Sequence, residues 1–239
     1  MRLDIFLVKK KMAESRSKAV HLIKQGKVLV NGVQVFKQSY DVKNDDEVEL
    51  AESFKYVSRG GYKIEDFFKK AGITPRGKSV LDIGCSTGGF SDFMLQNGAT
   101  EVVAVDIAKN IFSKKLLKDP RVKLIERLDA SNYELLKEKV GDKKFDIITI
   151  DVSNISLRKI LVNIPYFLKK DGFIVCLFKP QYEGGKGVIP ESQINRMAMD
   201  FEKWLKEKGF KVIFKAFSPL RGGPKGKGNK EIFYLLKLV

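Results

Sequence analysis

The feature that most constrains this chain is a short apolar run followed by a turn with three glycines, within residues 79–90. The run is apolar apart from Asp82, as expected of a buried strand. Gly84, Gly88 and Gly89 follow, and a helical pattern begins directly after them. Open α/β sheets bind nucleotide-like ligands over such a strand, turn and helix, because glycines let a ligand approach the backbone closely. Similar turns also occur where glycine serves only packing.

A second apolar run, residues 101–107, contains an acid that favours one class of ligand. Asp106 lies 22 residues after Gly84, near the spacing of about 20 residues at which such folds place an acid on a ribose hydroxyl. Asp82, just before the turn, would repel a pyrophosphate and attract an ammonium or sulfonium group. The two acids favour S-adenosylmethionine over a nicotinamide dinucleotide as the cofactor. A structural cap is the alternative role for Asp82.

Strand and helix patterns alternate from residue 78 onward, which predicts a mostly parallel α/β sheet with helices on both faces. The expected strands are 79–85, 101–107, 122–127, 145–151, 172–179, 210–217 and 231–238. The expected helices are about 90–97, 110–117, 132–140, 156–168 and 191–208. The last two strands have no helix between them, so they must pair antiparallel if they are neighbours. This arrangement is similar to the Rossmann-like sheet of S-adenosylmethionine-dependent methyltransferases, with its antiparallel last strand.

The formal net charge of the 239-residue chain is +16, which points to a polyanionic partner, nucleic acid before acidic lipid. A basic surface that serves only solubility is the alternative. Cys85 and Cys176 lie in apolar strand-like runs and are expected to be reduced and buried in a cytoplasmic protein. One histidine and the lack of metal-ligand spacing argue against a metal. No apolar run is as long as the roughly 18 residues that are needed to span a membrane. Nothing in the sequence indicates an obligate protein partner.

Residues 1–55 have the pattern of a separate unit, with two short helices, a strand, a tight turn at Asn31-Gly32 and a second strand. Nine basic and two acidic residues fall within residues 1–37, whereas the stretch that follows is acidic. Such a basic patch binds phosphates mainly through counterion release. The predicted nucleic-acid contacts, which include one arginine after this unit, are Arg2, Lys9, Lys10, Lys11, Arg16, Lys18, Lys24, Lys27 and Arg59.

The same stretch resembles the small RNA-binding module named after a ribosomal small-subunit protein. The signature is carried by residues 2–4 (Arg-Leu-Asp), 15–19 (Ser-Arg-Ser-Lys-Ala), 23–28 (Ile-Lys-Gln-Gly-Lys-Val) and 30–32 (Val-Asn-Gly). The resemblance implies structured RNA as the ligand, which charge alone does not distinguish from DNA. We therefore expect an α+β RNA-binding domain at residues 1–55, a linker at 56–62 and a methyltransferase domain at 63–239.

Polar residues end three of the expected strands, at the edge where open α/β sheets bind their ligands. These residues are Asp106, Asp151 and Lys179. A lysine after five apolar residues is costly to bury unless it is paired. We therefore expect Lys179 to point into a polar cleft. A structural salt bridge is the alternative role for this lysine. Asp151 lacks the following prolines and aromatic residue that are typical of base-amine methylation, and neither cysteine stands where the nucleophile for pyrimidine C5 does. A ribose hydroxyl remains as the group that a lysine and carboxylates suit.

Motifs spread over nearly the whole chain resemble the TlyA or hemolysin-A type of rRNA 2′-O-methyltransferases, within the FtsJ-like group. The matching pieces are residues 56–60, 62–63, 81–84, 86–90, 119–122, 151–153, 155–157 and 179–181. Three departures from the family pattern concern substrate choice more than chemistry. Asn154 stands where an aromatic residue is usual, Tyr182 replaces a phenylalanine, and the loop after Glu183 has a different sequence.

The resemblance implies methyl transfer to a ribose 2′-hydroxyl of ribosomal RNA or of a ribosomal subunit, with Lys63, Asp151, Lys179 and Glu231 as catalytic residues. Judged by its neighbours in the sequence alone, Lys63 is better explained as a solvated lysine. Lys179 would deprotonate the hydroxyl if Lys63 and desolvation lower its pKa, or would stay charged and only position the oxygen. The residues implied to hold S-adenosylmethionine are Asp82, Gly84, Ser86, Thr87, Gly88, Gly89, Phe90, Asp106 and Asp129.

Two other functions stay open from the sequence. One is a non-catalytic RNA-binding or ribosome-assembly factor with a degenerate cofactor fold, against which the complete set of four residues argues. The other is a membrane-active haemolysin, as the older name of the family suggests. The lack of a long apolar or strongly amphipathic surface helix in the sequence argues against it.

Overall fold

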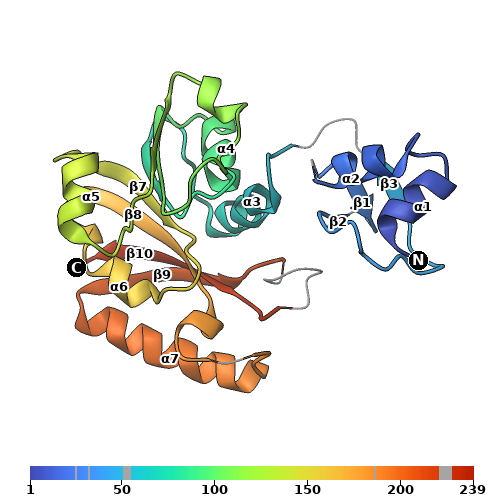
Figure 1. Cartoon of the computed structure of the whole chain (residues 1–239). Helices are drawn as coiled ribbons and strands as arrows, with labels where there is room; N and C mark the ends of the chain where they lie inside the picture. Colours follow the sequence, from blue (N-terminus) through green and yellow to red (C-terminus); the bar gives the residue numbers. More distant parts are fainter. Residues whose placement is uncertain (25, 32, 51–54, 186, 221–227) are drawn as a thin grey trace. The chain divides into compact units, whose positions relative to one another are not determined.

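A computed structural model describes the chain apart from residues 25, 32, 51–54, 186 and 221–227 and the side chain of Val33 (Figure 1). The described chain forms two compact units. Within the described residues, the first lies in 1–55, and the second contains residues 56–220 and 229–239. Each unit has a hydrophobic core of its own.

The first unit combines two helices and a three-stranded antiparallel sheet around one core. Its elements are α1 (Leu3–Lys9), α2 (Arg16–Lys24), β1 (Val28–Val30), β2 (Val33–Gln34) and β3 (Val48–Leu50), with strand order β2-β1-β3. Ser15 accepts the N–H of Lys18 at the start of α2, as its capping role predicts. β3 was not predicted from the sequence, and Gly32 of the predicted turn lies outside the described residues.

The second unit is built on a seven-stranded sheet in the order β6-β5-β4-β7-β8-β10-β9 (Figure 1). The strands are β4 (Ser79–Ile83), β5 (Glu101–Asp106), β6 (Val122–Glu126), β7 (Phe145–Ile150), β8 (Leu168–Phe178), β9 (Phe210–Phe217) and β10 (Ile232–Leu238). The pairs among β4 to β8 are parallel, and β10 is antiparallel to both β8 and β9. The predicted Rossmann-like sheet with an antiparallel last strand is confirmed, and that strand lies inside the sheet.

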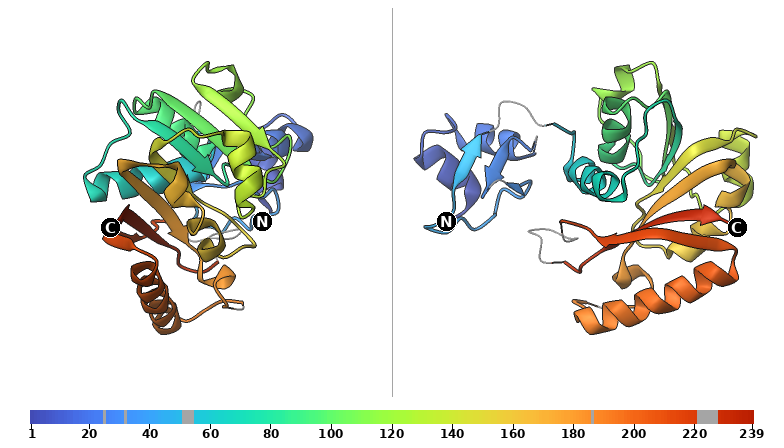
Figure 2. Two further views of the ribbon diagram at one scale, coloured as in Figure 1. Left: turned by 90° about the vertical axis from the view of Figure 1, so that its left-hand side faces the viewer. Right: turned by 180° about the vertical axis from the view of Figure 1, so that it is seen from behind.

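Helices cover both faces of this sheet (Figure 2). One face shares a core with α3 (Arg59–Ala71) and α4 (Gly89–Gln96), and the other shares a core with α5 (Tyr133–Val140), α6 (Leu157–Leu161) and α7 (Glu191–Glu207). Alternate residues of one strand enter opposite cores, as Ile147 and Ile148 of β7 do. The strands are therefore apolar on both sides, which explains why they read as nearly continuous apolar runs.

Two predicted helices differ in the structure. Residues 110–117 form turns with only a short 3₁₀ helix, η1 (Leu116–Lys118), because Asn110 has a positive φ of 60° and its N–H bonds to Glu126. The expected helix at 156–168 is shortened to α6 and a 3₁₀ turn, η2 (Ile164–Phe167). Proline at the start of η2 lacks the N–H that a continuous helix would need. Strand β8 begins directly after η2, earlier than predicted.

Candidate functional site

A cleft of about 590 Å³ opens at the carboxyl edge of β4, β5 and β7, where open α/β sheets bind their ligands. Its walls come from the turn after β4, the segments after β5, β6 and β7, and helix α6. Of the nine residues expected to hold the cofactor, four line this cleft: Gly84, Ser86, Asp106 and Asp129. The other five do not line it: Asp82, Gly88, Gly89 and Phe90 are buried, and Thr87 is exposed.

Two carboxylates on the wall of the cleft are fixed by hydrogen bonds. Asp106, at the end of β5, accepts the N–H of Ser86 at 2.7 Å and the N–H of Ala108 at 2.8 Å. Asp129, after β6, accepts the N–H and the hydroxyl of Ser131 at 2.9 and 2.7 Å. These bonds hold two acceptor groups at positions where hydroxyl or amine donors of a ligand could reach them.

The three glycines of the turn serve different purposes. Gly84 has a φ of 78° and lies so close to the end of β7 that a Cβ would come within 2.6 Å of the carbonyl oxygen of Asp151. A Cβ on Gly88 would strike a side chain of η1 at 2.5 Å, and one on Gly89 would strike Ser58 at 2.2 Å. At Gly88 and Gly89 the close approach predicted for a ligand is therefore made by neighbouring parts of the protein.

Asp82 lies beneath the turn and is fully buried. Its carboxylate accepts the hydroxyls of Ser91 and Thr149 at 2.6 and 2.7 Å, which ties β4 to α4 and β7. Burial raises the pKa of Asp82 to about 6, against the opposing effect of the two hydroxyls, and the charge of Asp151 adds to the rise. These bonds make Asp82 a structural link between three elements, which is the alternative that the sequence leaves open beside attraction of a sulfonium.

The four residues implied to be catalytic meet in two ion pairs beside the cleft. Lys63 Nζ lies 2.6 Å from Glu231 Oε2, and Lys179 Nζ lies 2.5 Å from Asp151 Oδ1. The two lysine side chains are each 11% exposed, and those of Glu231 and Asp151 are 3% and 22% exposed. Both pairs are thus largely withdrawn from water. We call Lys63, Asp151, Lys179 and Glu231 the tetrad.

The antiparallel strand explains why Glu231 lies near enough to Lys179 for its charge to act on that lysine. Asp151 and Lys179 directly follow the last residues of the parallel strands β7 and β8, at the carboxyl edge of the sheet. Strand β10 runs the other way, so its first residue, Ile232, pairs with Phe178, the last residue of β8. Glu231 therefore lies at the same edge of the sheet as the other two residues.

Lys63 reaches the tetrad from α3, whose start is fixed against α4. Tyr56 is 1% exposed, and its ring meets that of Phe93 edge to face with 6.0 Å between centroids. The carboxylate of Asp92 accepts the N–H of Val57 at 2.7 Å. Lys63 is therefore largely buried in an ion pair and is not the solvated lysine that its sequence neighbours suggest.

The charge of Lys179 follows from its surroundings. Burial lowers the pKa of Lys179, but the charges of Asp151 and Glu231 and the hydrogen bond to Asp151 raise it by more. The pKa of Lys179 therefore lies above its ordinary value. Lys63 does not lower it, because the charge of Lys63 is matched by that of Glu231 at 2.6 Å. This result favours a charged lysine that positions the oxygen over a neutral lysine that removes its proton.

Two residues beside the tetrad were not predicted as functional. Lys179 Nζ donates to the Oγ of Ser153 at 3.3 Å, and Ser153 lines the cleft. Asn154 also lines the cleft and has a positive φ of 63°. Their position directly after a strand that ends in an acid was the available signal, because such residues lie at the ligand edge of the sheet.

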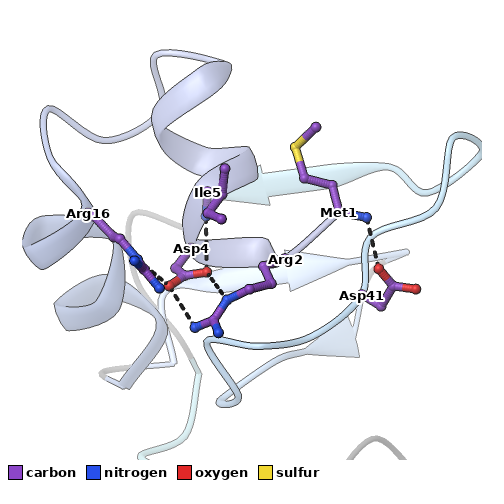
Figure 3. A network of polar contacts seen from close by, with 6 residues as sticks. All are labelled: Met1, Arg2, Asp4, Ile5, Arg16 and Asp41. Carbon is purple, nitrogen blue, oxygen red and sulfur yellow. Dashed lines mark hydrogen bonds and ion pairs between the residues drawn. The ribbon is translucent and has the colours of Figure 1, made fainter.

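In the first unit the buried carboxylate of Asp4 forms ion pairs with two of the arginines predicted to contact RNA (Figure 3). Asp4 is fully buried and accepts Nε and Nη2 of Arg2, both at 3.0 Å, and Nε of Arg16 at 2.8 Å. The hydrogen bond from Arg2 contributes most to lowering the pKa of Asp4, to about 2. The side chains of Arg2 and Arg16 stay 42% and 60% exposed, so two oriented guanidinium groups face solvent.

The other predicted RNA contacts are distributed over both units. Five lysines of the helical part are exposed, and a sixth, before β1, is half-buried; they are Lys9, Lys10, Lys11, Lys18, Lys24 and Lys27. Arg59 is half-buried and is the first residue of α3, so it belongs to the second unit. No helix among the described residues is long and apolar enough to cross a membrane.

The fold, with a cleft at the carboxyl edge of its sheet, is that of an α/β methyltransferase that carries an additional basic unit. The chain belongs to the FtsJ-like methyltransferase family, whose model matches residues 56–237, and an S4 domain matches residues 1–48. The predicted family relationship is thereby confirmed for both parts of the chain.

Proteins similar to this chain include relatives that match it over almost its whole length. It is 40% identical to the protein named Hemolysin A of Brachyspira hyodysenteriae, over 97% of both chains. It is 35% identical to the 23S rRNA (cytidine-2′-O)-methyltransferase TlyA of Campylobacter jejuni, over 98% of both chains. A solved structure from Streptococcus thermophilus, provisionally described as a hemolysin, aligns with 100% of this chain and 88% of its own at 33% identity, with a TM-score of 0.75.

Proposed function

We propose that this protein transfers a methyl group from S-adenosylmethionine to a ribose 2′-hydroxyl of ribosomal RNA, in the cytoplasm where ribosomes are found. The observation that carries the proposal is the meeting of the tetrad, from four distant parts of the chain, at the edge of the cleft. The names of relatives such as the Campylobacter enzyme support a cytidine as the modified nucleotide.

The cleft suits S-adenosylmethionine in size and in chemistry. Its volume of about 590 Å³ is within the range of small-molecule binding sites. Asp106 and Asp129 offer fixed acceptors for ribose hydroxyls and an adenine amine, and Ile107 and Ile111 provide apolar wall for a purine ring. Gly84 and Ser86 would hold the methionine end. When bound, this cofactor supplies a methyl group made electrophilic by a sulfonium.

The tetrad would orient the hydroxyl and receive its proton. Lys179, whose pKa is raised, holds the 2′-oxygen as a charged donor. The carboxylate of Asp151 lies beside the ammonium of Lys179 and is the acceptor for the hydroxyl proton. Lys63 and Glu231 form the second pair, and Glu231 keeps Lys179 charged. Alignment of the reacting atoms is then the main source of rate acceleration.

The first unit would hold the RNA. Arg2 and Arg16 present guanidinium groups, the side chains best suited to phosphate recognition. Both are fixed on Asp4, so part of the ordering cost of binding is already met by the fold. The exposed lysines of α1 and α2 add attraction to the phosphate backbone that depends on salt but not on sequence.

The decisive experiment is mass spectrometry of nucleosides from ribosomal RNA incubated with the protein and S-adenosylmethionine that carries a labelled methyl group. We expect the label on a ribose 2′-oxygen, in free RNA, in a subunit or in the whole ribosome. Label found only on a base, or no label in any of the three substrates, would contradict the proposal. The second outcome would favour a non-catalytic RNA-binding factor.

Membrane damage is a second candidate because one relative is named Hemolysin A. Leakage of a fluorescent dye from lipid vesicles tests it directly. Release of dye that tracks protein concentration, and that persists in a Lys179→Ala variant, would establish this activity as separate from methyl transfer.

A further inference from the structure

The segment that directly follows Lys179, residues 180–185 and 187–189, is fastened to the loop after Asp151. It begins with the 3₁₀ turn η3 (Pro180–Tyr182) and continues to Glu183, whose side chain is only 4% exposed. The carboxylate of Glu183 accepts the hydroxyl of Ser156 and the N–H of Leu157, both at 2.6 Å. Ser156 is the N-cap of α6 and Leu157 is its first residue, a few residues after Asp151.

The same segment is also fastened to the residues just before β10, which include Glu231. Asn229 is 6% exposed, and its Oδ1 accepts the N–H of Ile189 at 2.7 Å. Its Nδ2 donates to the carbonyl of Gly187 at 3.0 Å and to Gln181 Oε1 at 3.3 Å. Among the described residues, the hydrogen bonds of this buried amide all go to the segment that follows Lys179.

These contacts matter because the sheet does not fix Glu231 by itself. The pairing of β10 with β8 begins at Ile232, so Glu231 lies just outside the ladder, and its carbonyl accepts the N–H of Ser218 at 2.8 Å. Asp151 and Lys179 likewise follow the last residues of their strands. Three residues of the tetrad are thus at strand ends, where backbone pairing gives less constraint than inside the sheet.

We propose that Asn229 and Glu183 are positioning residues that set the geometry of the tetrad through the segment that follows Lys179. Glu183 holds this segment to the loop after Asp151, and Asn229 holds it to the residues just before Glu231. Lys179 is continuous with the segment. The inference rests on the proposed methyl transfer and names residues for that reaction that touch neither substrate nor cofactor.

The test is the variant Asn229→Ala, with Asn97→Ala as the matched control. Asn97 also donates from its Nδ2 to a backbone carbonyl, that of Phe93 at 2.8 Å, but at the far end of α4 from the cleft. We expect kcat for labelled-methyl transfer to fall by about 10-fold to 100-fold in Asn229→Ala, because a shift near 1 Å can cost about 100-fold. KM for RNA and Kd for S-adenosylmethionine should stay within about 2-fold.

The pH dependence of kcat separates positioning from a loss of folded protein. Lys179 faces Asp151, Glu231 and Tyr182, and Lys63 stands behind Glu231. If Glu231 moves away in Asn229→Ala, it no longer raises the pKa of Lys179, so the alkaline limit of kcat should shift to lower pH. The Asn97→Ala variant should keep the wild-type profile even if both variants melt at the same lower temperature.

A second pair of variants tests the other attachment. Glu183→Ala removes both hydrogen bonds and should lower kcat as Asn229→Ala does, whereas Glu183→Gln keeps an acceptor for Leu157 and a partner for Ser156 and should recover most of kcat. The inference is overturned if Asn229→Ala and Glu183→Ala keep kcat within about 2-fold, or if Asn97→Ala loses as much. Because wild type is assayed alongside, an inactive wild type would instead reject the proposed function.

Discussion

Lys63 and Glu231 are 168 positions apart in the chain, yet their charged atoms lie 2.6 Å from each other. Their side chains are 11% and 3% exposed, so the pair is nearly buried. Removing two charges from water costs about as much free energy as their attraction returns, so such a pair is poor evidence of a contribution to stability. Its place beside Lys179 and Asp151 instead agrees with the part in methyl transfer that we propose for these four residues.

Replacing one member of this pair should damage both stability and activity, whereas replacing both should damage activity alone. Lys63→Met leaves the carboxylate of Glu231 buried without its partner and should lower the free energy of unfolding by about 3–5 kcal/mol. The double variant Lys63→Met with Glu231→Met should regain most of that stability in urea titrations and stay inactive. A double variant with wild-type activity would show that the pair has no part in the reaction.

Lys179→Ala should reduce methyl transfer by about 10²-fold to 10⁴-fold, the range expected when a group acting on the reacting proton or oxygen is lost. S-adenosylmethionine should still bind, because Lys179 is not among the residues that line the cleft. Lys169→Ala is the matched control, since Lys169 pairs with Asp146 at 2.8 Å near the opposite ends of β7 and β8. Transfer assays measure the rate, and calorimetric titration measures the affinity for S-adenosylmethionine. Full activity in Lys179→Ala would show that this lysine has no part in the mechanism.

Asp82 should make the protein less stable as the pH rises. Its pKa is raised to about 6 in the fold, so its contribution to stability is complete below the unfolded pKa of about 4 and is lost as the pH rises through about 6. Asp82→Asn abolishes this dependence. The stability of the variant relative to wild type should therefore improve by about 2 kcal/mol between pH 4 and pH 7, as urea titrations at the two pH values would show.

The same variant tests whether Asp82 has a role toward the cofactor. Because Asp82 is buried on Ser91 and Thr149 and does not line the cleft, Asp82→Asn should bind S-adenosylmethionine with a Kd close to that of wild type. A loss of cofactor binding without any change in the pH dependence of stability would restore the direct role that the sequence suggested.

Arg2→Ala and Arg16→Ala should each weaken RNA binding and lower the slope of log K against log salt concentration by about 1. Lys139→Ala is the control, because Lys139 is a half-exposed cation of the second unit that pairs with Glu138. Filter binding of ribosomal RNA at several salt concentrations provides the slopes. Equal slopes for all three variants and wild type would exclude the arginines of Figure 3 from the RNA contact.

The fold was predictable because strands that are buried on both faces appear in the sequence as nearly continuous apolar runs. Residues such as Ile147 and Ile148 must both be apolar when they enter opposite cores. Residues 110–117 misled the prediction because their structure depends on a bond from Asn110 to Glu126 and on packing against Gly88, neither of which has a local signal.

The site was only partly predictable. Asp106, Asp151 and Lys179 could be found because each stands at the end of a strand or directly after it, and the ends of parallel strands share one edge. Lys63 could not be distinguished from a surface lysine by its own neighbours, and only the family resemblance singled it out, since its partner Glu231 is remote in the chain. The role of Asn229 could not be predicted for a similar reason, because its hydrogen-bond partners are about 40 or more residues away in the chain.

The interior place of β10 has a consequence for how this protein is made. During synthesis the chain emerges from its N-terminus onward, at about 5–20 residues per second, and folding follows that order. Every strand from β4 to β9 is available before β10, yet β8 and β9 cannot be joined, and Glu231 cannot be delivered, until β10 inserts between them. On the proposed mechanism, a nascent chain still lacking that segment would hold RNA through its first unit without transferring a methyl group.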